Sequence, residues 1–156
     1  MTDIPEAIVT DRDVYITRTF HAPRDIVWMF WTDPDRLAEW FGPTGFHSPA
    51  SGITSELVPG GVWRIEMHAD GSDEVFPMSA HIRLVIPPEY LEMIVGTRST
   101  SGQHEEVVLR VRLHDHGEVT RMTLHQGPLE DPDFRRLTRE GWLESFTKLE
   151  LALPHN

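Results

Sequence analysis

The sequence predicts a single α+β domain in which a curved antiparallel sheet wraps around a long C-terminal helix. Three observations predict it. Residues 53–126 form a succession of strand patterns separated by turn signals, which favours an antiparallel sheet. Two short helical patterns follow the first strand. The chain ends in an amphipathic helix whose apolar side needs a partner, and the sheet is the largest surface that can supply one.

The N-terminal part of the chain predicts one strand and two short helices. Residues 1–12 are expected to be a loose lead-in. Apolar and polar residues alternate over 14–20, which is a strand pattern, and a proline then suits the start of a helix over 23–31. A second helix, over 33–41, begins at an Asp-Pro pair that can cap it and ends because Gly42-Pro43 cannot continue it.

Five further strands are predicted, at residues 62–69, 78–86, 90–96, 107–113 and 119–126. Turn signals such as Asp70-Gly71 separate them. The residues expected to share the inward face of the second of these strands are Met78, Ala80, Ile82, Leu84 and Ile86. This assignment depends on strand register, because a single β-bulge would move the following side chains to the other face.

The last helix is predicted over 133–153, with Asp131 or Asp133 as its cap. One flank of its apolar half carries small residues, and the other carries large ones. The small ones are Gly141, Ser145 and Ala152, and the large ones are Trp142, Phe146 and Leu153. A glycine inside a helix costs about 1 kcal/mol relative to alanine. Either the backbone presses against a strand there, or the small flank leaves room for a ligand. The second explanation is favoured, because protein cores otherwise close such space.

Length and composition limit the classes of function. The 156 residues fit one domain, placed at 13–154. The formal net charge of −11 disfavours nucleic acid or an anionic membrane as a partner, because either would bring negative charge against an acidic surface. No Cys is present, and no apolar run approaches the roughly 20 residues of a membrane span, so neither thiol chemistry nor membrane insertion is expected. The N-terminus lacks the features of a secretory signal, which makes the cytoplasm the expected location.

Short motifs in a fixed order cover residues 14–153. They are Arg18-Thr19-Phe20-His21-Ala22-Pro23, Val27-Trp28, Ala38-Glu39-Trp40-Phe41-Gly42-Pro43, Pro59-Gly60-Gly61-Val62-Trp63, Pro87-Pro88-Glu89-Tyr90-Leu91 and Gly141-Trp142. In this order they resemble the bacterial proteins related to the activator of Hsp90 ATPase, within the START-like superfamily. The resemblance implies the helix-grip fold and an apolar cavity between sheet and long helix. It does not imply one activity, since relatives include ligand carriers, antibiotic self-resistance proteins, cyclases and regulators.

The candidate ligand cavity is expected between the inward face of the sheet and the apolar half of the last helix. The residues expected to line it are Trp40, Phe46, Trp63, Ile65, Met67, Met78, Ala80, Ile82, Met93, Leu109, Val111, Met122, Leu124, Thr138, Gly141, Trp142, Ser145 and Leu149. Methionine suits such a site because its flexible side chain adapts to irregular shapes, although the same residues would also fill a closed core.

The inward faces carry no convergent catalytic set. The polar residues in register are Thr120, Gln126, Thr138 and Ser145. General acid–base catalysis needs a placed acid or base, and no inward carboxylate, His or Lys has a partner. His114 and His116 form the tightest grouping of the nine His residues, which falls short of the three or four ligands of a metal site. Neither a metal nor another cofactor is expected.

Three functions remain, in decreasing order of support. The first is binding of a hydrophobic small molecule or lipid-like ligand between sheet and helix. The second is a cyclase or hydrolase acting on a hydrophobic substrate, which would need an inward acid or base. The third is a chaperone-associated interaction protein, as the name of the family suggests.

The outer face of the sheet is expected to be wet. The polar residues predicted there are Arg64, Glu66, His68, Ser79, His81, Arg83, Arg110, Arg112, Arg121 and His125. Such a mixed-charge face discourages sheet-to-sheet association. A homodimer, if one forms, should therefore use other surfaces.

Overall fold

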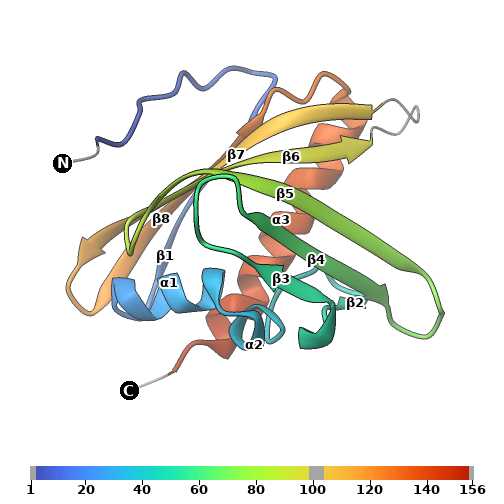
Figure 1. The fold of residues 1–156 in the computed structure, drawn as a ribbon, viewed down its shortest axis with the longest axis horizontal. Helices are drawn as coiled ribbons and strands as arrows, with labels where there is room; N and C mark the ends of the chain where they lie inside the picture. Colours follow the sequence, from blue (N-terminus) through green and yellow to red (C-terminus); the bar gives the residue numbers. More distant parts are fainter. Residues whose placement is uncertain (1–2, 99–103, 155–156) are drawn as a thin grey trace.

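The computed structural model describes residues 3–98 and 104–154 (Figure 1). The predicted elements occur in the predicted order, with three short elements added between residues 46 and 55, and the second helix ends at Leu37 rather than near Phe41. In chain order they are β1 (Val14–Phe20), α1 (Arg24–Thr32), α2 (Pro34–Leu37), β2 (Phe46–His47), the 3-10 turn η1 (Ala50–Gly52), β3 (Ile53–Ser55), β4 (Val62–Ala69), β5 (Val75–Ile86), β6 (Tyr90–Arg98), β7 (His104–His116), β8 (Val119–Gly127) and α3 (Pro132–Ala152). The predicted α+β class is confirmed. Within these residues, no helix is long and apolar enough to cross a membrane.

The strands form one curved antiparallel sheet that wraps around α3, as Figure 1 shows. Its order is β1-β8-β7-β6-β5-β4-β2, with β3 also paired to β4. β1 therefore pairs with the last strand, β8, and this pairing places α1 and α2 at one end of the sheet. The result is the predicted helix-grip arrangement, in which the concave face of the sheet holds the long C-terminal helix.

The core lies between the concave face and α3, because alternate residues of each strand point inward. On β4, Trp63 and Ile65 are buried, while Arg64 between them is partly exposed on the other face. From α3, the side chains of Trp142, Phe146 and Leu149 complete the same core. The outward side of α3 carries most of its charges together with exposed leucines such as Leu137 and Leu151.

A β-bulge in β5 corrects the predicted inward face of that strand. Pairing with β6 shifts between Ile82 and Leu84, so that Leu84 lies opposite Glu92 and Val85 lies opposite Leu91. Leu91 is fully buried, and Val85 packs against the core. The predicted inward positions of Leu84 and Ile86 are therefore wrong, because the bulge reverses the alternation after Ile82.

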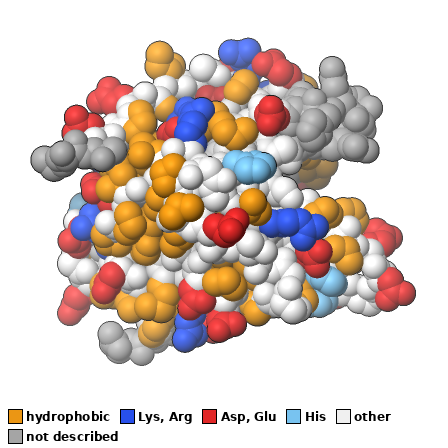
Figure 2. Space-filling model, viewed as in Figure 1, with side chains coloured by type: hydrophobic (Ala, Val, Ile, Leu, Met, Phe, Trp, Pro, Cys, Tyr) orange, Lys and Arg blue, Asp and Glu red, His pale blue; other side chains and the backbone are white. Residues whose placement is uncertain are grey.

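The outer face of the sheet is wet only in part. Ser79, His81, Arg83 and Arg121 are exposed, but His125 is buried, and Arg110 and Arg112 are partly covered. The reason is the N-terminal segment, because residues 4–9 share a small outer hollow with residues of β6, β7 and β8. The expectation of a solvated His125 is wrong. On the molecular face in Figure 2, charged side chains of both signs lie among hydrophobic ones.

Candidate functional site

A hollow of about 760 Å³ lies between α3 and the β4–β6 part of the sheet. The described residues that line it are Phe41, Pro43, Met67, Phe76, Pro77, Met78, Val95, Gly96, Gln126, Phe134, Thr138, Gly141, Trp142 and Ser145. None of these side chains carries a charge. The hollow is therefore apolar over most of its wall, with a few polar atoms, which is the usual composition of a small-molecule site.

An aromatic cluster lies next to the hollow and shares Trp142 with its lining. Trp31 lies at its centre, with ring centroids 5.0 Å from Trp40, 6.5 Å from Trp63, 5.8 Å from Trp142 and 6.3 Å from Phe146. Each of the four indole N–H groups in this cluster donates a hydrogen bond. Their acceptors are Met122 Sδ for Trp31, the Phe30 carbonyl for Trp40, the Trp31 carbonyl for Trp63 and Gln126 Oε1 for Trp142. This pairing holds the rings in defined orientations.

The loop after α2 forms a second wall, and α3 holds it by polar contacts. Lys148 Nζ donates to the carbonyls of Pro43 at 3.1 Å and Phe46 at 2.8 Å, and the Thr44 N–H donates to Glu144 Oε1 at 3.1 Å. Burial lowers the pKa of Lys148, against the nearby charges of Asp70 and Glu144. Lys148 and Glu144 of α3 thus fix the position of Pro43 at the hollow.

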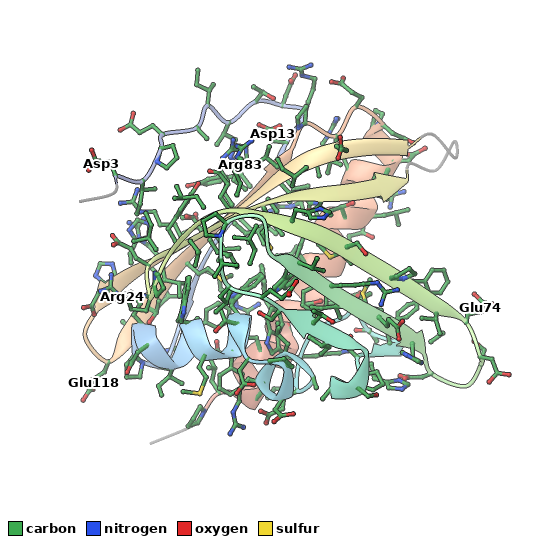
Figure 3. All side chains as sticks on the ribbon, in the orientation of Figure 1. Asp3, Asp13, Arg24, Glu74, Arg83 and Glu118 are labelled. Carbon is green, nitrogen blue, oxygen red and sulfur yellow. The ribbon has the colours of Figure 1, made fainter. Side chains whose placement is uncertain are left out.

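The rim of the hollow is apolar and exposed. Phe76 is 45% exposed and packs edge-on against Phe46, with ring centroids 5.5 Å apart. Phe76 and Pro77 lie at the start of β5, next to the hairpin that carries Glu74 at its tip in Figure 3. An apolar molecule that packed against this exposed phenylalanine would bury apolar surface of both partners, so the rim is suited to contact with an apolar ligand.

The structure brings together only part of the predicted cavity set. Those that line the hollow are Met67, Met78, Thr138, Gly141, Trp142 and Ser145. Those that lie in the buried core away from its lining are Trp40, Trp63, Ile65, Ala80, Ile82, Met93, Leu109, Val111, Met122, Leu124 and Leu149. Phe46 is not among the lining residues but packs against Phe76 at the rim. The core residues share the inward faces of the strands with the lining, but neighbouring side chains fill the space around them.

Gly141, on the small flank of α3, borders the hollow. A Cβ added at Gly141 would meet one described atom within 4 Å, the Cβ of Pro43 at 3.9 Å, which is an ordinary contact. Within residues 3–98 and 104–154, no strand backbone lies within 4 Å of this added Cβ. Of the two explanations for the glycine, the structure therefore supports the one that leaves room in the hollow.

Sequence reasoning missed several lining residues. Phe76 and Pro77 were missed because the strand was expected to begin at Met78, whereas β5 begins at Val75. Phe41 and Pro43 were available in the Trp-Phe-Gly-Pro motif, but only Trp40 of that motif was assigned to the cavity. The position of Phe134 on the apolar half of α3 was a usable signal as well.

A polar cluster centred on Glu92 lies on the outer face of the sheet, under the N-terminal segment. The buried carboxylate accepts hydrogen bonds from the Tyr90 hydroxyl and from Arg83 Nε at 2.5 Å, while Arg110 Nε lies 3.4 Å away. Burial by itself would raise the pKa of Glu92, but the hydrogen bonds and both arginine charges outweigh it and hold that pKa below its usual value. Burial and the bond to Glu92 raise the pKa of Tyr90.

The same cluster extends to the start of β1. His125 Nε2 lies 2.9 Å from Asp13 Oδ2, and Arg110 also approaches the His125 ring. Figure 3 shows Asp13 and Arg83 on the same side of the sheet. These contacts tie the N-terminal segment to the outer face, so the cluster has a structural role. In the described ranges, no group of three His, Asp or Glu residues is arranged to hold a metal ion.

Comparison with known proteins identifies relatives of the chain and of its fold. The sequence profile of the family described as Activator of Hsp90 ATPase homolog 1-like protein matches residues 21–153. None of the curated proteins matches the chain. Among solved structures, the AHSA1 protein from Silicibacter pomeroyi is similar, with 24% identity, a TM-score of 0.76, and coverage of 89% of this chain and 95% of that one.

Two further structures share the fold. A protein from Chromobacterium violaceum has 18% identity and a TM-score of 0.82, and the match covers 94% of this chain and all of that one. A protein from Arthrobacter aurescens has 22% identity and a TM-score of 0.77, with 96% and 93% covered. At these identities the likeness establishes the fold.

Proposed function

The chain belongs to the Activator of Hsp90 ATPase homolog 1-like family, and from that premise we propose that it binds a hydrophobic small molecule in the hollow between α3 and β4–β6. The helix-grip fold of this family commonly binds hydrophobic ligands. The observation that carries the proposal is the open space of about 760 Å³ beside Gly141. Ordinary cores do not keep such space, because their interiors are close-packed.

The lining supports binding rather than acid–base catalysis. A site of roughly 300–1,000 Å³ with mainly apolar walls is typical of small-molecule binding. The polar side chains in the described lining are an amide, two hydroxyls and an indole N–H, from Gln126, Thr138, Ser145 and Trp142. General acid–base catalysis at neutral pH would need a group that exchanges protons there. We therefore favour a carrier or sensor of an apolar molecule over a cyclase or hydrolase.

Substitution of Gly141 tests the proposal. The fluorescent hydrocarbon 1,6-diphenylhexatriene is expected to bind the parent protein with increased emission, and Gly141→Leu is expected to weaken this binding at least tenfold. The leucine side chain would project into the hollow and occupy part of its volume. The thermal midpoint should hold or rise, because loss of a helical glycine favours the helix by up to about 1 kcal/mol. Fluorescence titration and thermal unfolding measure the two effects.

Glu140→Leu is the matched control. It adds the same side chain one residue earlier, at an exposed position of α3, so the affinity for the probe should stay at the parent value. The proposal fails if the parent does not bind the hydrocarbon. It fails also if Gly141→Leu and Glu140→Leu bind it equally well. Native mass spectrometry of freshly purified protein would reveal a retained ligand as a mass increment that disappears on denaturation.

A further inference from the structure

Polar atoms are few in the hollow, and two of the side chains that supply them are almost completely buried. Gln126 on β8 and Ser145 on α3 are each 3% exposed, and both line the hollow. Thr138, the third, donates its hydroxyl proton to the Phe134 carbonyl at 2.8 Å. Thr138 is therefore already engaged as a donor, whereas Gln126 and Ser145 can still act on a ligand.

The amide of Gln126 has a defined orientation. Trp142 Nε1 lies 2.7 Å from one end of that amide, and an indole nitrogen can only donate a hydrogen bond. The atom that faces it must therefore be the oxygen, Oε1. The amide nitrogen then lies on the other side, where it donates no hydrogen bond to a described residue, and it is not among the fully buried unpaired atoms, so it borders the hollow. An apolar ligand that entered the hollow would take water away from this donor, which costs about 1–3 kcal/mol unless the ligand accepts its hydrogen bond.

The hydroxyl of Ser145 is in a similar position. It makes no hydrogen bond to the described residues, although the side chain is buried at the hollow. A hydroxyl rotates freely and can donate to an acceptor placed near it. Together with the Gln126 amide, it makes the polar part of the hollow rich in donors. The ligand that fits such a site carries a hydrogen-bond acceptor.

The charges around the hollow argue against an anionic acceptor. No side chain in the described lining is positively charged, and Lys148, the one lysine in the sequence, donates to the carbonyls of Pro43 and Phe46. A carboxylate would lose its hydration on entering the hollow with no cation to compensate it. A carbonyl oxygen of a ketone, ester or quinone accepts hydrogen bonds without that penalty.

We propose that the hollow selects a neutral, ring-bearing molecule whose carbonyl oxygen accepts a hydrogen bond from the Gln126 amide. Phe41, Phe134 and Trp142 offer ring faces and edges for an aromatic or polycyclic body. This inference rests on the proposed function of the hollow and narrows it to a ligand class. Gln126 acts here as a binding residue, and its contact with Trp142 sets the direction in which it donates.

The test compares two ligands that differ in the acceptor. 2-Acetylnaphthalene carries a ketone, and 2-ethylnaphthalene has nearly the same size and shape without one. Each is titrated against bound 1,6-diphenylhexatriene in the parent and in Gln126→Met. The affinity of the ketone relative to the hydrocarbon should fall about five- to tenfold in the variant, as expected for one lost hydrogen bond. Because the ketone and the hydrocarbon are compared within the same protein, any general weakening of binding caused by the unpaired Trp142 N–H affects both affinities and cancels in their ratio.

Gln126→Glu provides a second variant, which keeps an oxygen for the Trp142 N–H and the length of the side chain. It replaces the amide donor by a carboxyl oxygen, so at pH 8 the ketone should lose at least tenfold relative to the hydrocarbon. In the parent, 2-naphthoate should bind at least tenfold more weakly than the ketone. Tighter binding of the carboxylate would mean that the hollow selects anions and would overturn the inference.

The outcomes separate the inference from the proposed function. If the hydrocarbon probe binds the parent but the ketone-to-hydrocarbon ratio is the same in parent and both variants, the hollow binds apolar molecules and Gln126 does not select them. That result overturns the inference and leaves the proposed function standing. If the probe does not bind the parent, the proposed function fails and the inference fails with it.

Discussion

Replacement of Trp31 by alanine is expected to lower the free energy of unfolding by about 3–5 kcal/mol. Trp31 is 1% exposed and contacts three other tryptophans and Phe146, so its removal leaves a large cavity at the centre of the aromatic cluster. It also removes the N–H donor to Met122. Urea unfolding followed by far-UV circular dichroism measures the change, which should appear as a lower midpoint with a similar slope.

Met29→Ala is the control for this substitution. Met29 lies on the same helix, two residues away, and is 43% exposed. Its replacement should change the free energy of unfolding by less than about 1 kcal/mol, because little buried volume is lost. Similar losses for the two variants would show that the aromatic cluster does not contribute the packing energy inferred from its contacts.

Glu92→Gln is expected to lower the free energy of unfolding by about 2–3 kcal/mol at pH 7. Loss of the carboxylate charge leaves the partly buried Arg110 without its ion-pair partner. The expected loss of stability is smaller than for a fully buried ion pair, because Arg83, the other partner of Glu92, is about half exposed and solvent screens its charge. Glu39→Gln is the control, since Glu39 pairs with Arg36 in an exposed position and should contribute about 0.5 kcal/mol or less.

The effect of Glu92 should depend on pH in a defined direction. Its pKa in the folded protein lies below the ordinary value of 4.5. The stabilisation by the carboxylate is therefore complete above pH 4.5 and is lost as the pH falls through the folded pKa. The difference between parent and Glu92→Gln should be constant from pH 6 to 8 and should shrink below pH 4.5. A difference that grew on acidification would contradict the assignment of a stabilised carboxylate.

Local periodicity was enough to predict most of the fold. Strand β1 was predicted with its observed bounds, because a half-buried strand alternates in polarity and His21-Ala22-Pro23 ends it clearly. The short strands β2 and β3 were not predicted, since a strand of two or three residues is too short for alternation to show. The bulge in β5 was also invisible, because Leu84 and Ile86 continue an alternating pattern that the pairing with β6 interrupts.

The candidate site was less predictable than the fold. Inward-facing residues can be read from alternation, but whether the space beside them is filled depends on the distance between α3 and the sheet. Residues such as Leu109 and Met122 therefore shared the predicted pattern with Met67 and Met78, although only the latter two line the hollow. Glu92 was missed because the outer face was expected to be wet, and no local pattern shows that the N-terminal segment lies over that face.

The position of the hollow has a consequence for the dynamics of α3. The buried residues of this helix are Trp142, Ser145, Phe146 and Leu149, all in its second half. The inward residues of the first half, Phe134 and Thr138, are only partly buried and face the hollow. Local unfolding of the first turns would thus separate fewer packed groups than unfolding of the last turns, and its free energy should be smaller.

The two halves of α3 should accordingly belong to different cooperative units. Amide hydrogens of the first turns would exchange with solvent through local opening, while those after Trp142 would exchange only when the aromatic cluster comes apart. A molecule seated in the hollow would add contacts to the first half and so suppress its opening by mass action. Ligand binding in the hollow and helical order at the start of α3 are therefore coupled, so that each one favours the other.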